Sequence, residues 1–273
     1  MKELSIRAIS GAIYALLLIG SLYLQNALTA LLVVFGILSL VEFSKLIQLK
    51  SVAQYIIFIL FFAAFWYLCL WNKDIKGSDE AIQILLVITI FVNLILIKDL
   101  FTTKKIPIFE SKSYIVTTFY LTSGFVFMLL IANYQNVFTP LLLLGVFILI
   151  WVNDSAAYLV GKNFGKQKLF PSISPKKTVE GFLGGLFFAC ISSYFISLYT
   201  ETLGFTSWLI LAILVSVFGT LGDLIESKFK RQAGVKDSGV IMPGHGGLLD
   251  RLDSVIFVAP FVYLFLRILS YVS

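Results

Sequence analysis

The chain has 273 residues, of which 59% are hydrophobic and 13% charged, and its mean hydropathy is +0.96. A soluble domain carries about 25% charged residues, so this composition excludes an ordinary soluble protein and indicates an integral membrane protein. The formal net charge is +6. In a membrane protein such an excess reflects basic cytoplasmic loops, so we expect the lipid bilayer, and no nucleic acid, as a partner.

Apolar runs between clusters of charges or turn residues predict nine membrane spans. Most have about the 17–25 residues that a helix needs to cross the hydrocarbon core, and they lack the alternating pattern of an outer-membrane barrel. In chain order the spans are 4–24, 27–49, 52–71, 81–97, 114–134, 137–152, 181–199, 206–222 and 254–272. The predicted fold class is therefore all-α, a polytopic bundle of about nine transmembrane helices with two long cytoplasmic loops that form the site.

The first span imitates a signal peptide, because Lys2 and Arg7 precede an apolar run. No Ala-x-Ala cleavage site follows, and a second apolar run begins almost at once. We therefore expect a retained first helix.

The basic residues predict the orientation. With a cytoplasmic N-terminus, 18 of the 21 lysines and arginines fall on the cytoplasmic side, and the exceptions are Lys73, Lys76 and Arg267. The positive-inside rule then favours a multi-pass protein of the cell (inner) membrane, with its N-terminus in and its C-terminus out. Two polar loops, 153–181 and 223–253, share the cytoplasmic side. We divide the chain into N-terminal transmembrane helices (1–150) and a C-terminal catalytic region (151–273).

The second loop carries two carboxylate pairs, Asp223 with Glu226 and Asp250 with Asp253. Each pair is three residues apart and shares one face of a helix. Carboxylates at a membrane helix end are costly unless they are paired or bind metal. Because the chain has one histidine and both cysteines lie in apolar runs, zinc is improbable and Mg²⁺ is favoured. The alternative is a set of surface salt bridges worth about 0–1 kcal/mol each.

Cations and glycines accompany these carboxylates. Lys228, Lys230, Arg231, Lys236 and Arg251 provide a positive field for phosphate oxygens. The glycines around His245 allow backbone N–H groups to approach a phosphate, although such a loop is also typical of a simple turn. The combination predicts metal-assisted phosphoryl or nucleotidyl transfer.

The first loop ends in a second polar run before the next span. Thr178 is predicted to cap a helix, with Ser174, Lys176 and Lys177 facing an anion. A structural interpretation, a cap plus snorkelling lysines, explains Thr178 and one lysine but not the whole run. Asp154, which ends the preceding span, joins the candidate site.

The segment 227–254 resembles the signature of phosphatidate cytidylyltransferases (CDP-diacylglycerol synthases), and 154–181 resembles their second characteristic region. The resemblance is carried by Ser227, Lys228, Lys230, Arg231, Lys236, Asp237, Gly239, Pro243, Gly244, His245, Gly246, Gly247, Asp250, Arg251, Asp253 and Ser254. It implies the reaction of CTP with phosphatidate to give CDP-diacylglycerol and pyrophosphate in phospholipid biosynthesis. It also implies Mg²⁺, with or without a monovalent cation, and a homodimer.

The resemblance also implies residue roles. Asp223 and Asp250 are the expected Mg²⁺ ligands, with Asp253 in reserve, and Lys176, Lys177 and Arg251 are expected on phosphates. The substrate-binding candidates are Asp154, Ser174, Thr178, Lys228, Lys230, Arg231, Lys236, Gly244, Gly246 and Gly247. His245 is kept among the catalytic candidates. However, a phosphate monoester with a second pKa near 6 is already dianionic and needs no strong base.

Two other functions remain open. A CTP-dependent polyprenol or phytol kinase would transfer the γ-phosphoryl group to a lipid alcohol and would need a base. A transporter would place charges near the centres of its spans, whereas these charges lie at span ends and in loops.

Overall fold

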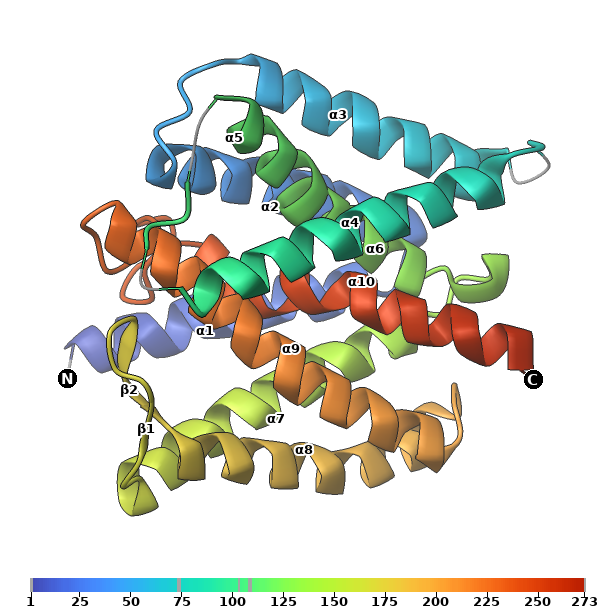
Figure 1. Cartoon of the computed structure of the whole chain (residues 1–273). Helices are drawn as coiled ribbons and strands as arrows, with labels where there is room; N and C mark the ends of the chain where they lie inside the picture. The colour runs from blue at the N-terminus through green and yellow to red at the C-terminus, as the bar shows by residue number, and fades with distance from the viewer. Residues whose placement is uncertain (1, 73–74, 103, 108–109, 273) are drawn as a thin grey trace.

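Long apolar helices make up most of the computed structural model, which describes residues 2–72, 75–102, 104–107 and 110–272 (Figure 1). Lys73 lies outside the described residues. A π-helical turn at Tyr67–Trp71 continues α3 (Ala53–Trp66). Another at Thr117–Thr122 joins α5 (Glu110–Val116) to α6 (Ser123–Ile131). The helices are α1 (Lys2–Ser21), α2 (Gln25–Leu46), α3 (Ala53–Trp66), α4 (Ser78–Leu100), α5 (Glu110–Val116), α6 (Ser123–Ile131), α7 (Pro140–Phe164), α8 (Val179–Thr200), α9 (Phe205–Gln232) and α10 (Leu249–Val272).

The predicted all-α membrane fold is confirmed. Within the described chain, eight helical segments are long and apolar enough to cross a membrane, and α5, the π turn and α6 together form one of them. The first expected span, residues 4–24, corresponds to α1, in which the described residues give a shorter apolar stretch, Ile6–Ser21.

The two polar loops are shorter than expected, because the helices run on past the first charges. Helix α7 continues from the expected end at residue 152 to Phe164, and α9 continues from 222 to Gln232. A charge marks where a chain leaves the hydrocarbon, whereas a helix ends where its backbone hydrogen bonds stop. Consequently Asp154 and Asp223 lie on helices rather than in loops.

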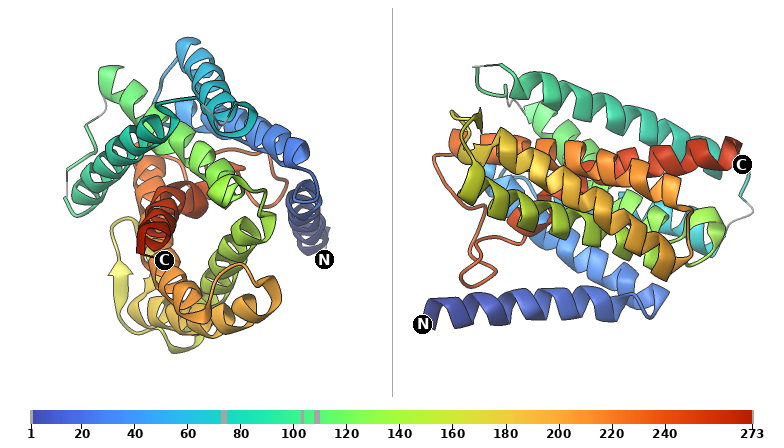
Figure 2. Two further views of the ribbon diagram at one scale, coloured as in Figure 1. Left: turned by 90° about the vertical axis from the view of Figure 1, so that its right-hand side faces the viewer. Right: turned by 90° about the horizontal axis from the view of Figure 1, so that it is seen from below.

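Close packing of the last four helices forms the framework of the C-terminal half. Helix α7 packs on α8, α8 on α9, and α9 on α10. At Gly181, near the start of α8, a Cβ would lie 2.7 Å from the Ala157 carbonyl oxygen of α7. Small residues allow such close approach of helices in membranes. The spans of α5–α6 and α10 are the most deeply buried, while α1 lies at the edge of the bundle (Figure 2).

A β-hairpin not expected from the sequence interrupts the helical pattern between α7 and α8. Strand β1 (Lys168–Phe170) pairs antiparallel with β2 (Ser174–Thr178), with Lys168 opposite Thr178 and Phe170 opposite Ser174. The hairpin, the 233–248 loop and the N-terminus lie at one end of the bundle, and the C-terminus lies at the other (Figures 1 and 2). The two polar segments therefore share one end, as the distribution of charge predicted.

Candidate active site

A cavity of about 810 Å³ opens at this end of the bundle, between α7, the hairpin, α8, α9 and α10. It collects residues from both polar segments that the sequence singled out. Ten of the predicted site residues line it: Asp154, Ser174, Lys176, Lys177, Thr178, Asp223, Lys230, Asp250, Arg251 and Asp253. The two segments therefore contribute to one site.

Three carboxylates form a cluster at this site. Asp223 and Glu226 come from α9 and Asp253 from α10, and each offers an oxygen within 4.8 Å of the others. Glu226 is fully buried and Asp253 nearly so. Oxygen-only donors suit hard divalent cations, so the three carboxylates could hold an ion of this class. The sequence analysis paired Glu226 with Asp223 by spacing but did not assign it to metal.

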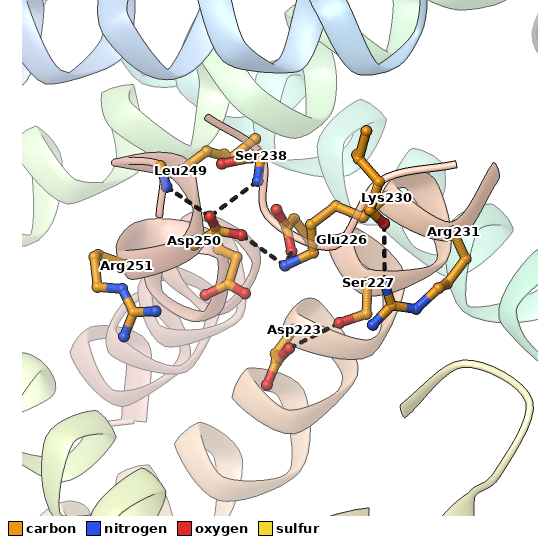
Figure 3. Close-up of polar contacts among 12 residues, drawn as sticks. Asp223, Glu226, Ser227, Lys230, Arg231, Ser238, Leu249, Asp250 and Arg251 are labelled. Carbon is orange, nitrogen blue, oxygen red and sulfur yellow. Dashed lines mark hydrogen bonds and ion pairs between the residues drawn. The ribbon is translucent and has the colours of Figure 1, made fainter. Parts of the chain in front are cut away.

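Two lysines balance the carboxylates, and Figure 3 shows one of them, Lys230. Lys177 of β2 pairs with Asp223, and Lys230 of α9 pairs with Glu226 and, at 2.6 Å, with Asp250. Burial alone lowers the pKa of Lys177, but the Asp223 charge and hydrogen bond outweigh it, so the pKa lies above its usual range. Lys177 therefore remains a cation over the physiological pH range.

Asp250 ties the 233–248 loop to the start of α10. Its Oδ1 accepts from Lys230, and its Oδ2 accepts the backbone N–H groups of Ser238 at 2.9 Å and Gly247 at 2.7 Å (Figure 3). It lies beside the acidic cluster, lines the same cavity, and is not one of the three clustered carboxylates.

The hairpin places the first polar segment against the cluster. As alternate residues of a strand face opposite ways, β2 turns Lys177 inward and leaves Lys176 exposed at the cavity's edge. Thr178 Oγ1 accepts the Gly181 N–H at 3.0 Å and caps α8. The predicted cap is thus confirmed.

Two predicted phosphate-binding cations line neither this cavity nor the second one described below. Lys228 Nζ donates to the carbonyl oxygens of Asp99 at 2.5 Å and Thr102 at 2.8 Å, which holds the end of α4. Arg231 donates to the carbonyl oxygens of Ile173 at 3.3 Å and Val235 at 2.9 Å. Their positions on α9 direct them away from the face that carries Asp223 and Lys230.

The 233–248 loop, which we call the glycine loop, lines a second cavity of about 580 Å³. Lys236, Gly244, His245 and Gly246 line it, together with Arg7 of α1, and it shares Asp237 and Arg251 with the first cavity. Burial, then the charges of Arg251 and Arg7, lower the pKa of His245. His245 is therefore neutral at pH 7 and does not line the cavity that holds the acidic cluster.

Glu42 of α2 is a buried carboxylate that the sequence analysis missed. It is 1% exposed, and it accepts the Leu249 N–H at 2.8 Å and the Ser238 hydroxyl at 3.2 Å. Any Cβ at Gly247 would collide with Ser238 Oγ and with this carboxylate. The available signal was a lone acidic residue inside an apolar span, a default sign of function.

Comparison with known proteins identifies similar chains. A model described as the cytidylyltransferase family matches residues 5–269. The phosphatidate cytidylyltransferases of Bacillus subtilis (strain 168) and Staphylococcus aureus (strain COL) are 51% identical over 124 and 126 residues. That of Staphylococcus haemolyticus (strain JCSC1435) is 49% identical over 126 residues. Each alignment covers 45% of this chain and 46% to 48% of the relative, so the chain spans about half the length of the curated relatives it matches.

Proposed function

Because this chain belongs to the cytidylyltransferase family, we propose that it transfers the cytidylyl group of CTP to phosphatidate, giving CDP-diacylglycerol and pyrophosphate. The observation that carries the proposal is the first cavity, beside which three carboxylates and two lysines meet at one end of a membrane bundle. A water-soluble nucleotide and a membrane-held lipid can meet there. The names of the relatives support the same reaction.

The chemistry requires charge stabilisation rather than a base. An oxygen of the phosphatidate phosphate attacks the α-phosphorus of CTP. The bond from that phosphorus to the oxygen that bridges the α- and β-phosphorus atoms breaks, and pyrophosphate leaves with the electron pair. The attacking dianion carries no proton that must be removed. The barrier is repulsion between anions, so positioning and positive charge dominate catalysis.

The residues divide into cation-holding and phosphate-holding groups. Asp223, Glu226 and Asp253 would hold Mg²⁺, which supplies positive charge to the triphosphate oxygens when bound. The sequence-based choice of Asp250 as a ligand stays a proposal, since Lys230 now occupies its Oδ1. Lys177, Lys176 and Arg251 would hold phosphate oxygens, because they line the cavity around the cluster.

We extend the proposal to the surroundings of the site. The end of the helix bundle that carries the first cavity lies on the cytoplasmic side of the cell membrane, as the distribution of basic residues predicts. The homodimer implied by the resemblance, and a monovalent cation beside Mg²⁺, remain predictions.

The test is to incubate the purified full chain in detergent with labelled CTP, phosphatidate and Mg²⁺. We expect labelled lipid and pyrophosphate in equal amounts, and no product from Asp223→Asn. The matched control is Asp79→Asn, which removes a carboxylate paired with Arg267 outside both cavities and should retain activity. Release of CDP with a polyprenol acceptor would establish a lipid kinase instead, and nucleotide movement across vesicles without reaction would establish a transporter.

A further inference from the structure

The second cavity lies between the N-terminal half of α1 and the glycine loop. Arg7 of α1 lines it, as do Lys236 and His245 of the loop. Arg251 and Asp237 line both cavities. The two cavities are therefore neighbours that meet at Arg251 and Asp237.

Helix α1 is fixed to this loop by specific contacts. Ser10 Oγ lies 2.7 Å from His245 Nδ1 and donates to the Pro243 carbonyl oxygen at 3.0 Å. Both bonds are satisfied when Nδ1 of the neutral ring carries the proton. The Arg7 stem lies against Gly244, where a Cβ would come within 2.8 Å of Cγ, and the positive φ of +76° at this residue also favours glycine. The contacts hold Arg7 at the cavity wall.

The cavity has a surplus of positive charge. Arg7, Lys236 and Arg251 face it, and Asp237 is the one carboxylate among the described residues that line it. Among the described residues, none of these three cations forms an ion pair. Guanidinium groups without carboxylate partners are suited to phosphate oxygens, which they bind through charge-assisted hydrogen bonds.

We propose that Arg7 of α1 completes, with Arg251 and Lys236, a subsite for the pyrophosphate end of the nucleotide. This inference rests on the proposed function. A single lipid phosphate can occupy only one cavity, whereas a triphosphate is a chain of phosphoryl groups and can extend past Arg251 into the second. The acidic cluster then lies at the reacting phosphorus, and the leaving pyrophosphate lies under α1.

The proposal makes α1 part of the active site rather than a membrane anchor. Arg7→Gln removes the guanidinium, and Arg7→Lys keeps the charge but loses the two-pronged geometry. Lys45→Gln is the control, because it removes an exposed cation of α2 that lines neither cavity.

Two measurements test the subsite. In turnover, we expect Arg7→Gln to raise the KM for CTP and the inhibition constant of pyrophosphate by about ten- to a hundredfold. The KM for phosphatidate should stay within twofold, Arg7→Lys should recover part of the loss, and Lys45→Gln should match the wild type. The second measurement is the calorimetric affinity of Mg²⁺-pyrophosphate for the wild type and for Arg7→Gln. It does not depend on catalytic turnover.

The outcomes separate the two proposals. If the wild type fails to make CDP-diacylglycerol but binds pyrophosphate in an Arg7-dependent way, the proposed function fails and the subsite stands. If only the KM for phosphatidate rises in Arg7→Gln, the cavity holds the lipid headgroup and the proposal is overturned. Unchanged constants for all ligands in Arg7→Gln would also overturn it.

Discussion

Removing one carboxylate from the acidic cluster should weaken Mg²⁺ binding more than any other single change at the site. Asp223→Asn and Asp253→Asn each keep the side-chain volume and remove one of the three clustered carboxylates. Two unit charges 4 Å apart interact by about 4 kcal/mol at an effective dielectric constant of about 20. Since about 1.4 kcal/mol is tenfold in affinity, we expect the Mg²⁺ requirement to rise at least about a hundredfold.

The assay is initial rate of labelled-lipid formation against Mg²⁺ concentration, at saturating CTP and phosphatidate. Asp223→Asn and Asp253→Asn should shift the half-saturating concentration upward, with residual rate recovered in part at high Mg²⁺. Asp79→Asn, the control from outside both cavities, should follow the wild-type curve. The same titration decides Asp250, since an equal shift assigns it as a ligand, and a fall in kcat alone assigns it to holding the loop.

The reasoning is refuted by a wild-type Mg²⁺ curve in both Asp223→Asn and Asp253→Asn. Loss of folding is the competing explanation for an inactive variant. Thermal unfolding of Asp253→Asn in detergent distinguishes them, because this change removes a charge from a like-charged cluster and should leave Tm unchanged or raise it when Mg²⁺ is absent. Asp223→Asn also removes the partner of Lys177, so its Tm should fall.

Four other predictions concern topology, charge, protonation and stability. Cysteines placed at Lys166 and Lys236 should react with an impermeant reagent only when the cytoplasmic face is exposed, and labelling from outside intact cells would contradict the topology. Lys177→Gln should lower kcat/KM at least about tenfold. The loss should be smaller in Lys176→Gln, whose side chain is exposed, and absent in Lys166→Gln, because Lys166 lines neither cavity. Because the pKa of Lys177 is raised, this residue should give no alkaline limb of kcat/KM below about pH 10. Because the pKa of His245 is lowered by burial, Arg251 and Arg7, this side chain binds fewer protons in the folded protein than in the unfolded chain below about pH 6.5. Tm should therefore fall as pH drops through this range, and less so in His245→Gln. Loss of the acidic limb of kcat/KM in that variant would instead make His245 a base. Glu42→Ala should lower the free energy of unfolding by about 1–3 kcal/mol, because it leaves the buried Leu249 N–H without an acceptor. The control is Ser39→Ala on the same helix, which should change Tm little, because the Ser39 hydroxyl has no partner among the described residues.

The sequence by itself determined the membrane class, the approximate spans and the two polar segments at one end. These properties are local, because a helix needs a minimum apolar length to cross the bilayer and charges resist entry into hydrocarbon. The motif between Ser227 and Ser254 also led to the family, because its residues lie within one stretch of chain. Asp223, Lys177 and Asp253 lie in or next to the two motif segments, 154–181 and 227–254, and could be chosen as site residues before their contacts were known.

Only the tertiary structure decided which of these residues meet. Lys228 and Lys230 are two positions apart, yet the turn of α9 places Lys230 among the carboxylates and Lys228 on the carbonyl oxygens at the end of α4. Glu42 and Arg7 lie about two hundred residues before the loop they contact, so no spacing rule connects them to it. A helix turns about 100° per residue, and contacts between distant segments depend on how whole helices pack. The face that each charge presents, and therefore its partner, is fixed by that packing and not by its position in the motif.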